Sequence, residues 1–241
     1  MPDIVTDAIV LRHAAYRDYD RMLTLLSPRL GRIDAIARGA RRTKSQLANA
    51  AELFNAGEYT LRLLKGRYSV TSCQIMSGFY ELRLDVERLT HGAYYLALAE
   101  AVTLPDMPAE ALFHLLLRAL AFICHEGAPL TLATLTFELC YLAANGQFPE
   151  LTSCVICGAK LFGDCRFDVT AGGAACDACA PGARRLSLNA RRLMYLLPRK
   201  GYEALNQYAS MERVYAEAAR ATRDFVLRVS EVRPKVLPEM T

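Results

Sequence analysis

The stretch Cys154-Val155-Ile156-Cys157-Gly158 is followed by a second pair in Cys176-Asp177-Ala178-Cys179, with 18 residues between Cys157 and Cys176. Two residues between the thiols let each pair turn its sulfur atoms toward one point, and the loop between the pairs lets them meet. This spacing is typical of a four-thiolate zinc site. We therefore expect Cys154, Cys157, Cys176 and Cys179 to be zinc ligands, with Gly158 easing the tight turn of the first knuckle.

The ligand set predicts a structural metal. A catalytic zinc keeps one position open for water, whereas four thiolates leave no open position. The chain has no H-x-E element, no H-E-x-x-H, no phosphate-binding glycine loop and no G-x-S-x-G elbow. We therefore expect structural zinc and no enzymatic activity.

Other roles for the cysteines are less favoured. A thioredoxin-like site needs a single CxxC at the start of a helix, and here two pairs face each other. Iron also binds four thiolates, although the paired spacing favours zinc. Cys165 lies between the pairs as a possible substitute ligand, but its position in an expected strand argues against that role.

Helical periodicity flanks the cysteine segment on both sides. Before it, apolar residues recur on helical turns, and Pro108 and Gly127 sit where the middle helix should start and stop. We expect a first helix that contains Tyr94, Leu96, Leu98 and Val102, and further helices from Glu110 to Glu126, from about Thr131 to Asn145, from Ser187 to Leu197 and from Glu212 to Val232. Ser187 and Ser210 are the expected caps of the last two.

The amino-terminal third has the pattern of strands. Five short segments with turn residues between them predict a small closed barrel. They are Asp7–Leu11, Arg21–Leu26, Gly31–Arg38, Glu58–Leu64 and Tyr68–Cys73. The Ala-rich stretch Gln46–Glu52 fits a short helix equally well.

Positive charge concentrates in the same third. Residues 1–80 hold 12 Lys and Arg against 7 Asp and Glu, and the remainder holds 17 against 18. Four cations, Arg38, Arg41, Arg42 and Lys44, follow the third strand without an acid among them. Such a loop can follow a phosphate backbone and displace its counterions, so it is the predicted DNA contact. A loop that is charged only for solubility is an equally weighted alternative.

Two further groups accompany this loop. Aromatic residues that could stack on unpaired bases, or simply fill the barrel, are interleaved nearby. They are Tyr16, Tyr19, Phe54, Tyr59 and Tyr68. A second basic cluster, Arg184, Arg185, Arg191 and Arg192, follows the cysteine segment and either extends a DNA path or solvates that face.

Together these segments resemble RecO, a family of bacterial recombination mediators. The amino-terminal resemblance is carried by Asp7–Leu11, Tyr16–Arg21, Leu23–Ser27, Gly31-Arg32 and Ala37–Arg42. The apolar helical middle and the four cysteines resemble the zinc-bearing members. The one departure is Asp18, where the family more often has Glu.

The resemblance implies an α+β multi-domain chain. Residues 1–80 would form a five-stranded OB-fold barrel, and residues 81–241 an α-helical domain with a zinc finger inserted at about 151–183. It further implies that the protein binds single- and double-stranded DNA, anneals complementary strands, and works with RecR and single-stranded-DNA-binding protein to load RecA. A zinc-ribbon transcription or adaptor protein, whose cysteine segment contacts a partner, is the alternative.

The sequence also predicts where the protein acts. Its first residues include Asp3 and lack a continuous apolar stretch, so a secretory signal is not expected. No segment supplies the roughly 18 uninterrupted apolar residues of a membrane span. We therefore expect a cytoplasmic, nucleoid-associated protein.

Overall fold

The computed structural model describes residues 3–125, 127–232 and 237–238. The chain divides into two compact units, residues 1–124 and residues 125–241, and each is described by itself. Within the described ranges, no helix is both long enough and apolar enough to cross a membrane.

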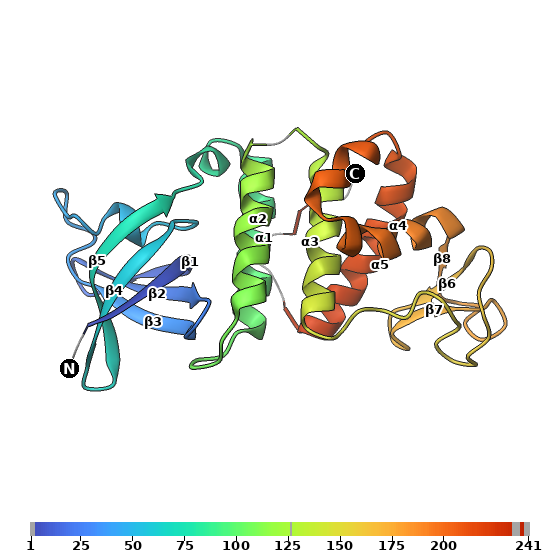
Figure 1. Cartoon of the computed structure of the whole chain (residues 1–241), viewed down its shortest axis with the longest axis horizontal. Coiled ribbons are helices and arrows are strands. Elements are labelled where there is room, and N and C mark those ends of the chain that lie inside the picture. The colour runs from blue at the N-terminus through green and yellow to red at the C-terminus, as the bar shows by residue number, and fades with distance from the viewer. Residues whose placement is uncertain (1–2, 126, 233–236, 239–241) are drawn as a thin grey trace. The chain divides into compact units, whose positions relative to one another are not determined.

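Five strands of the first unit form a closed barrel, the blue to teal arrows of Figure 1. The strands are β1 (Ile4–Tyr16), β2 (Asp20–Ser27), β3 (Gly31–Ala37), β4 (Ala56–Leu64) and β5 (Arg67–Ser77). Their order is β1-β2-β3-β5-β4, with β4 pairing back onto β1. All neighbours are antiparallel except β3 and β5, which are parallel. The predicted five-stranded barrel is confirmed, and its strands are mostly longer than the periodicity indicated.

Side-chain alternation explains why these segments become strands of a barrel. In β3, Ile33, Ala35 and Ala37 are buried while the residues between them are at least partly exposed, which is the period of two that a strand requires. Apolar residues from all five strands share one core with the segment that precedes β4. Its buried members include Val10, Leu23, Leu25, Ile33, Tyr59, Leu61 and Val70.

The first unit continues into helices after the barrel. A short 3₁₀ turn, η1 (Asn49–Ala51), is the only helix in the stretch Gln46–Glu52, all of which is described. After β5 come η2 (Tyr80–Arg83), α1 (Val86–Val102) and α2 (Glu110–His125). Asp85 caps α1 by accepting hydrogen bonds from the N–H groups of Glu87 and Arg88 at 2.9 and 3.1 Å.

The connector between α1 and α2 packs against the β2–β3 turn. The N–H of Arg32 donates to the carbonyl of Leu104 at 3.1 Å. Gly31 has φ +64°, and a Cβ there would lie 2.3 Å from the carbonyl oxygens of Leu104 and Met107. This position therefore accepts only glycine.

The second unit is built on α3 (Leu130–Ala144), α4 (Leu188–Lys200), η3 (Tyr202–Gln207) and α5 (Glu212–Ser230). Most residues of α3 are buried, which explains why its sequence is apolar around the whole circumference. Glu138 of α3 is fully buried and pairs with the guanidinium of Arg223 on α5. This pair neutralises two charges that would be costly to bury alone.

The two predicted caps have different outcomes. The Ser187 hydroxyl accepts a hydrogen bond from the N–H of Ala190 at 3.2 Å, so this cap is confirmed. The cap at Ser210 is wrong: α5 begins after Met211, and no side chain caps it. Ser210 lies one residue too early to reach the free N–H groups of the first turn.

The cysteine segment lies between α3 and α4. It includes a three-stranded sheet of order β7-β6-β8, formed by β6 (Cys165–Asp168), β7 (Gly173–Ala175) and β8 (Arg184–Leu186), drawn in orange in Figure 1. Phe167 of β6 meets Phe225 of α5 edge to face, with ring centroids 6.0 Å apart. The α+β fold class with its four-cysteine cluster is thereby confirmed.

Candidate nucleic-acid interface and metal centre

The basic loop leaves the end of β3 and is held against the β1–β2 turn. The N–H of Gly39 donates to Asp20 Oδ1 at 2.8 Å, and the N–H of Arg41 donates to the carbonyl of Tyr19 at 2.9 Å. Gly39 has φ +67°, a conformation that a residue without Cβ adopts at little cost. The loop therefore has a defined backbone rather than a free one.

The four predicted DNA contacts divide into two pairs. All four side chains are exposed. Arg41 donates to the carbonyls of Asp18 and Arg17 at 3.2 and 3.4 Å, and the Arg42 guanidinium lies 5.0 Å from the centre of the Tyr19 ring. These two cations brace the loop on the neighbouring turn.

Arg38 and Lys44 are the other pair. Within the ranges that the structure describes, neither side chain forms an ion pair or a hydrogen bond. Both side chains are exposed to solvent. Their ammonium and guanidinium groups are available to an external anion.

Sequence reasoning missed three cations that share a groove with Arg38. The groove has a volume of about 540 Å³ and is also lined by Arg17, Lys65 and Arg67. Lys65 and Arg67 lie at the hairpin between β4 and β5, where the sequence indicates only a turn. They share this lining with Arg38 because the barrel pairs β5 with β3 in parallel, with Tyr68 opposite Ala35. No local pattern in the sequence carries that information.

The four predicted metal ligands come together in the second unit. The sulfur atoms of Cys154, Cys157, Cys176 and Cys179 all lie within 4.8 Å of one another. A tetrahedral zinc with bonds of about 2.3 Å would place its sulfur ligands about 3.8 Å apart, so the cluster fits such an ion. The cluster can hold a metal ion such as zinc.

Backbone geometry prepares the first knuckle for a metal. Gly158 has φ +76°, and its N–H donates to the carbonyl of Cys154 at 2.8 Å. Backbone N–H groups of Cys157 and Cys176 point toward the Cys154 sulfur and lower the pKa of that thiol to about 6. Hydrogen bonds to the charged form favour it, so Cys154 is poised to be a thiolate at neutral pH.

The fourth cysteine shows why a cation suits this cluster. Contacts with the Cys176 and Cys157 sulfurs raise the pKa of Cys179 to about 12. Four thiolates at this separation repel one another, and a bound dication removes that repulsion. Cys165 lies in β6, buried and outside the cluster.

The second basic cluster does not act as one surface. Arg184 pairs with Asp224 at 2.8 Å, and Arg185 pairs with Asp164 at 3.3 Å. Arg191 is buried and donates to the carbonyls of Leu151, Leu161 and Gly163 at 2.9 to 3.1 Å. Arg191 therefore anchors the cysteine segment to α4.

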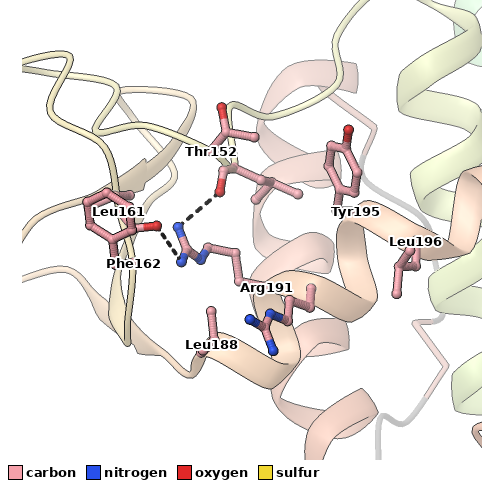
Figure 2. Close-up of a pocket in the computed structure, with 9 residues that line it drawn as sticks. Thr152, Leu161, Phe162, Leu188, Arg191, Tyr195 and Leu196 are labelled. Atoms are coloured by element: carbon pink, nitrogen blue, oxygen red, sulfur yellow. Dashed lines mark hydrogen bonds between the residues drawn. The ribbon is translucent and has the colours of Figure 1, made fainter.

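A hollow of about 480 Å³ lies beside this anchor (Figure 2). Its lining is largely apolar and includes Leu161, Phe162, Leu188 and Leu196. Figure 2 shows the Arg191 guanidinium hydrogen-bonded to the segment that carries Leu161, so this cation is already occupied. Arg192 is the exposed cation at the hollow.

Comparison with known proteins matches both parts of the chain. The family profile described as "Recombination protein O N terminal" matches residues 1–79, and "Recombination protein O C terminal" matches residues 83–238. The DNA repair protein RecO of Alkaliphilus metalliredigens is 38% identical over 176 residues, which are 73% of this chain and 72% of that protein.

Two further relatives extend the similarity over most of the length. The DNA repair protein RecO of Acetivibrio thermocellus is 30% identical over 92% of this chain and 89% of its own. That of Anaeromyxobacter dehalogenans strain 2CP-C is 35% identical over 93% and 89%. Because the two profiles together match nearly the whole chain, in amino- to carboxyl-terminal order, the chain belongs to the RecO family of DNA repair and recombination proteins.

Proposed function

We propose that this protein is a non-enzymatic recombination mediator that binds single- and double-stranded DNA and anneals complementary strands. The observation that carries the proposal is the basic loop, in which Arg41 and Arg42 brace the backbone while Arg38 and Lys44 stay free to meet phosphates. A preformed loop loses less conformational entropy on binding than a flexible one. The four residues together are the proposed DNA contacts.

The mechanism is non-covalent. Cations on the loop neutralise phosphates and release their counterions, so affinity falls as salt rises. Neutralising two strands at once lowers the repulsion between them and lets complementary bases pair. Phosphate contacts carry no sequence information, so sequence preference is weak.

The proposal extends to partners through the family. RecR and single-stranded-DNA-binding protein are the proposed partners. Together with RecR, the protein would help to load RecA onto single-stranded DNA that is coated with single-stranded-DNA-binding protein. Residues 1–80 form the proposed DNA-binding domain. Residues 81–241 form the proposed helical domain, with the zinc finger at about 151–183.

Zinc is the proposed structural cofactor, held by Cys154, Cys157, Cys176 and Cys179. Bound there, the ion would supply folding free energy and no open coordination position for water. Arg191 ties the loop around this site to α4 through three carbonyls. The cysteine segment therefore supports the helical unit and takes no part in chemistry.

One observation favours the alternative of an adaptor that contacts a partner through the cysteine segment. Phe162 is 83% exposed and Ile156 is 52% exposed, both on this segment. Exposed apolar side chains of this size often mark contact surfaces. The two interpretations differ in whether the basic loop matters for DNA binding.

The deciding experiment is Arg38→Ala with Lys44→Ala, measured for single-stranded DNA affinity across a salt series. Each phosphate contact contributes a slope of about −0.7, so at 0.1 M salt the double variant should bind roughly 25-fold more weakly. The slope should become shallower by about 1.4. Annealing of strands coated with single-stranded-DNA-binding protein, with RecR present, should slow as well.

Arg29→Ala is the matched control. Arg29 is an exposed cation in the β2–β3 turn, at the opposite end of these strands from the loop. Seven residue pairs at about 3.3 Å each place it roughly 20 Å away. An unchanged affinity and slope in the double variant, or an equal loss in Arg29→Ala, would contradict the placement of the site.

A further inference from the structure

A second group of metal-ligating side chains lies outside the cysteine segment. The donor atoms of Glu81, Cys124 and His125 all lie within 4.8 Å of one another. Glu81 belongs to η2, and Cys124 and His125 are the last two residues of α2. Carboxylate oxygen, thiolate sulfur and imidazole nitrogen are the side-chain donors that bind zinc in proteins. The group therefore has the chemistry of a site for a thiophilic divalent cation.

The thiol and the carboxylate of this group are already in contact. Cys124 is 7% exposed, and its thiol donates a hydrogen bond to Glu81 Oε2 at 3.2 Å. A tetrahedral zinc with ordinary bond lengths would separate such a sulfur and oxygen by about 3.6 Å. A dication can therefore take the place of the shared proton, which passes to solvent as the thiolate coordinates the metal.

His125 can supply the nitrogen ligand. It is exposed at the end of α2, and within the described part of the chain its ring forms no hydrogen bond or ion pair. A neutral imidazole keeps one ring nitrogen with a lone pair for a metal. Rotation of this exposed side chain can bring that nitrogen to the bonding distance of an ion on the Cys124 sulfur.

The two elements that carry the ligands are fixed by neighbouring side chains. Arg83 of η2 donates to Asn55 Oδ1 at 3.1 Å. Arg88 of α1 donates to the carbonyl of Cys124 at 3.1 Å, one of the carbonyls that a helix leaves without a partner at its end. The Arg88 guanidinium also lies 3.6 Å from Asp85, a carboxylate that offsets its repulsion of a bound cation. The ligands are therefore held close together before a metal arrives.

We propose that Glu81, Cys124 and His125 form a second metal site, which binds Zn²⁺ or a similar thiophilic dication and leaves one coordination position open to water. Three protein ligands with an open position contrast with the closed four-thiolate cluster. With one thiolate in place of four, this site binds zinc more weakly, so dialysis empties it while the cluster keeps its ion. The site ties η2 to α2, outside the five strands of the barrel, and is occupied only when free zinc is plentiful.

The test is a titration of Co²⁺ into the dialysed, zinc-loaded full-length protein. Zinc stays in the cluster, because four thiolates favour it. One further equivalent of Co²⁺ should bind, with a sulfur-to-cobalt charge-transfer absorption from Cys124. Cys124→Ser, Glu81→Gln and His125→Asn should each weaken this binding more than about tenfold, since losing a direct ligand costs at least as much as losing an outer-shell partner.

Two matched controls separate the site from other groups of the same kind. Cys73→Ser changes a half-buried thiol of β5, and His114→Asn changes an exposed imidazole of α2. Both variants should retain the further equivalent of Co²⁺ and its absorption. A loss in either control equal to that of Cys124→Ser would overturn the site.

The remaining outcomes each decide the proposal. The absence of a further equivalent, or an unchanged charge-transfer absorption in Cys124→Ser, would overturn it. Unchanged affinity in Glu81→Gln or in His125→Asn would show cobalt on a lone thiol or an incomplete ligand set, and would overturn the three-ligand site. These two substitutions alter exposed side chains, so they decide the question if Cys124→Ser disturbs the end of α2. DNA binding enters none of these outcomes, and the proposed function is tested separately.

Discussion

The barrel and the cysteine segment reach a defined structure by different means. The barrel core buries apolar residues from five strands, including Leu23, Leu25 and Leu61. The corresponding cluster around the cysteines contains only Cys154, Ala175 and Ala180 as buried members of the described chain. Burial of large side chains stabilises the first region, whereas the second buries few of them, Phe167 among these, and we propose that it depends on zinc bound at its thiols. The proposed DNA contacts lie on the region that needs no metal.

Removing the metal should have the largest effect, and it should affect the cysteine segment alone. Structural zinc contributes about 10–16 kcal/mol of binding free energy to small zinc modules. We expect Cys154→Ser with Cys176→Ser to lose zinc and to unfold residues 151–183, as measured by metal analysis and hydrogen exchange. DNA affinity of the barrel should persist.

Cys73→Ala is the matched control for that variant. Cys73 is a half-buried thiol of β5, outside the cluster, and its loss should leave the zinc content unchanged. Zinc retained after the double substitution would refute the ligand set. A parallel loss of DNA binding would show that the two regions are not independent.

A cavity in the barrel core should destabilise the barrel, and metal removal should not alter this effect. Leu25 is fully buried, so Leu25→Ala should lower the free energy of unfolding by about 2–5 kcal/mol. Denaturant unfolding of the barrel should shift equally with and without a chelator. Leu84→Ala, at a 68% exposed position, should change stability by less than about 0.5 kcal/mol. A change in barrel stability that depends on the chelator would contradict the independence of the barrel from the metal.

The smallest effect concerns a single hydroxyl. Tyr59 is fully buried and donates to the carbonyl of Ala50 at 2.7 Å, in the segment between the basic loop and β4. Tyr59→Phe removes this bond and should cost about 1–2 kcal/mol. Denaturant unfolding measures the difference, and Tyr80→Phe is the exposed control.

The same hydroxyl gives a pH prediction. Burial raises the pKa of Tyr59 above its ordinary value near 10. The protonated form is therefore favoured by folding, and its contribution to stability is fully present below pH 10 and lost only as the pH rises toward the folded pKa. The difference between wild type and Tyr59→Phe should be constant from about pH 5 to 9. A difference that varies in this range would indicate another cause.

Local patterns predicted the elements and the cysteine cluster, because both depend on short sequence spacing. Alternation in residues 31–37 is visible without a structure, and so is the pair of CxxC motifs. The groove was not predictable, since Arg38 and Arg67 line the same hollow only through the parallel pairing of β3 with β5. The second basic cluster was misleading for a related reason: burial separates Arg191 from Arg192, although the two are adjacent in sequence.

The backbone that covers Gly31 is synthesised later than the barrel itself. The backbone that packs over this glycine, at Leu104 and Met107, is made after all five strands. At about 5–20 residues per second, the roughly 30 residues beyond β5 take about 2–6 seconds to appear. A nascent barrel that closes within this interval does so with the turn uncovered, and the hydrogen bond from Arg32 to Leu104 then forms afterwards.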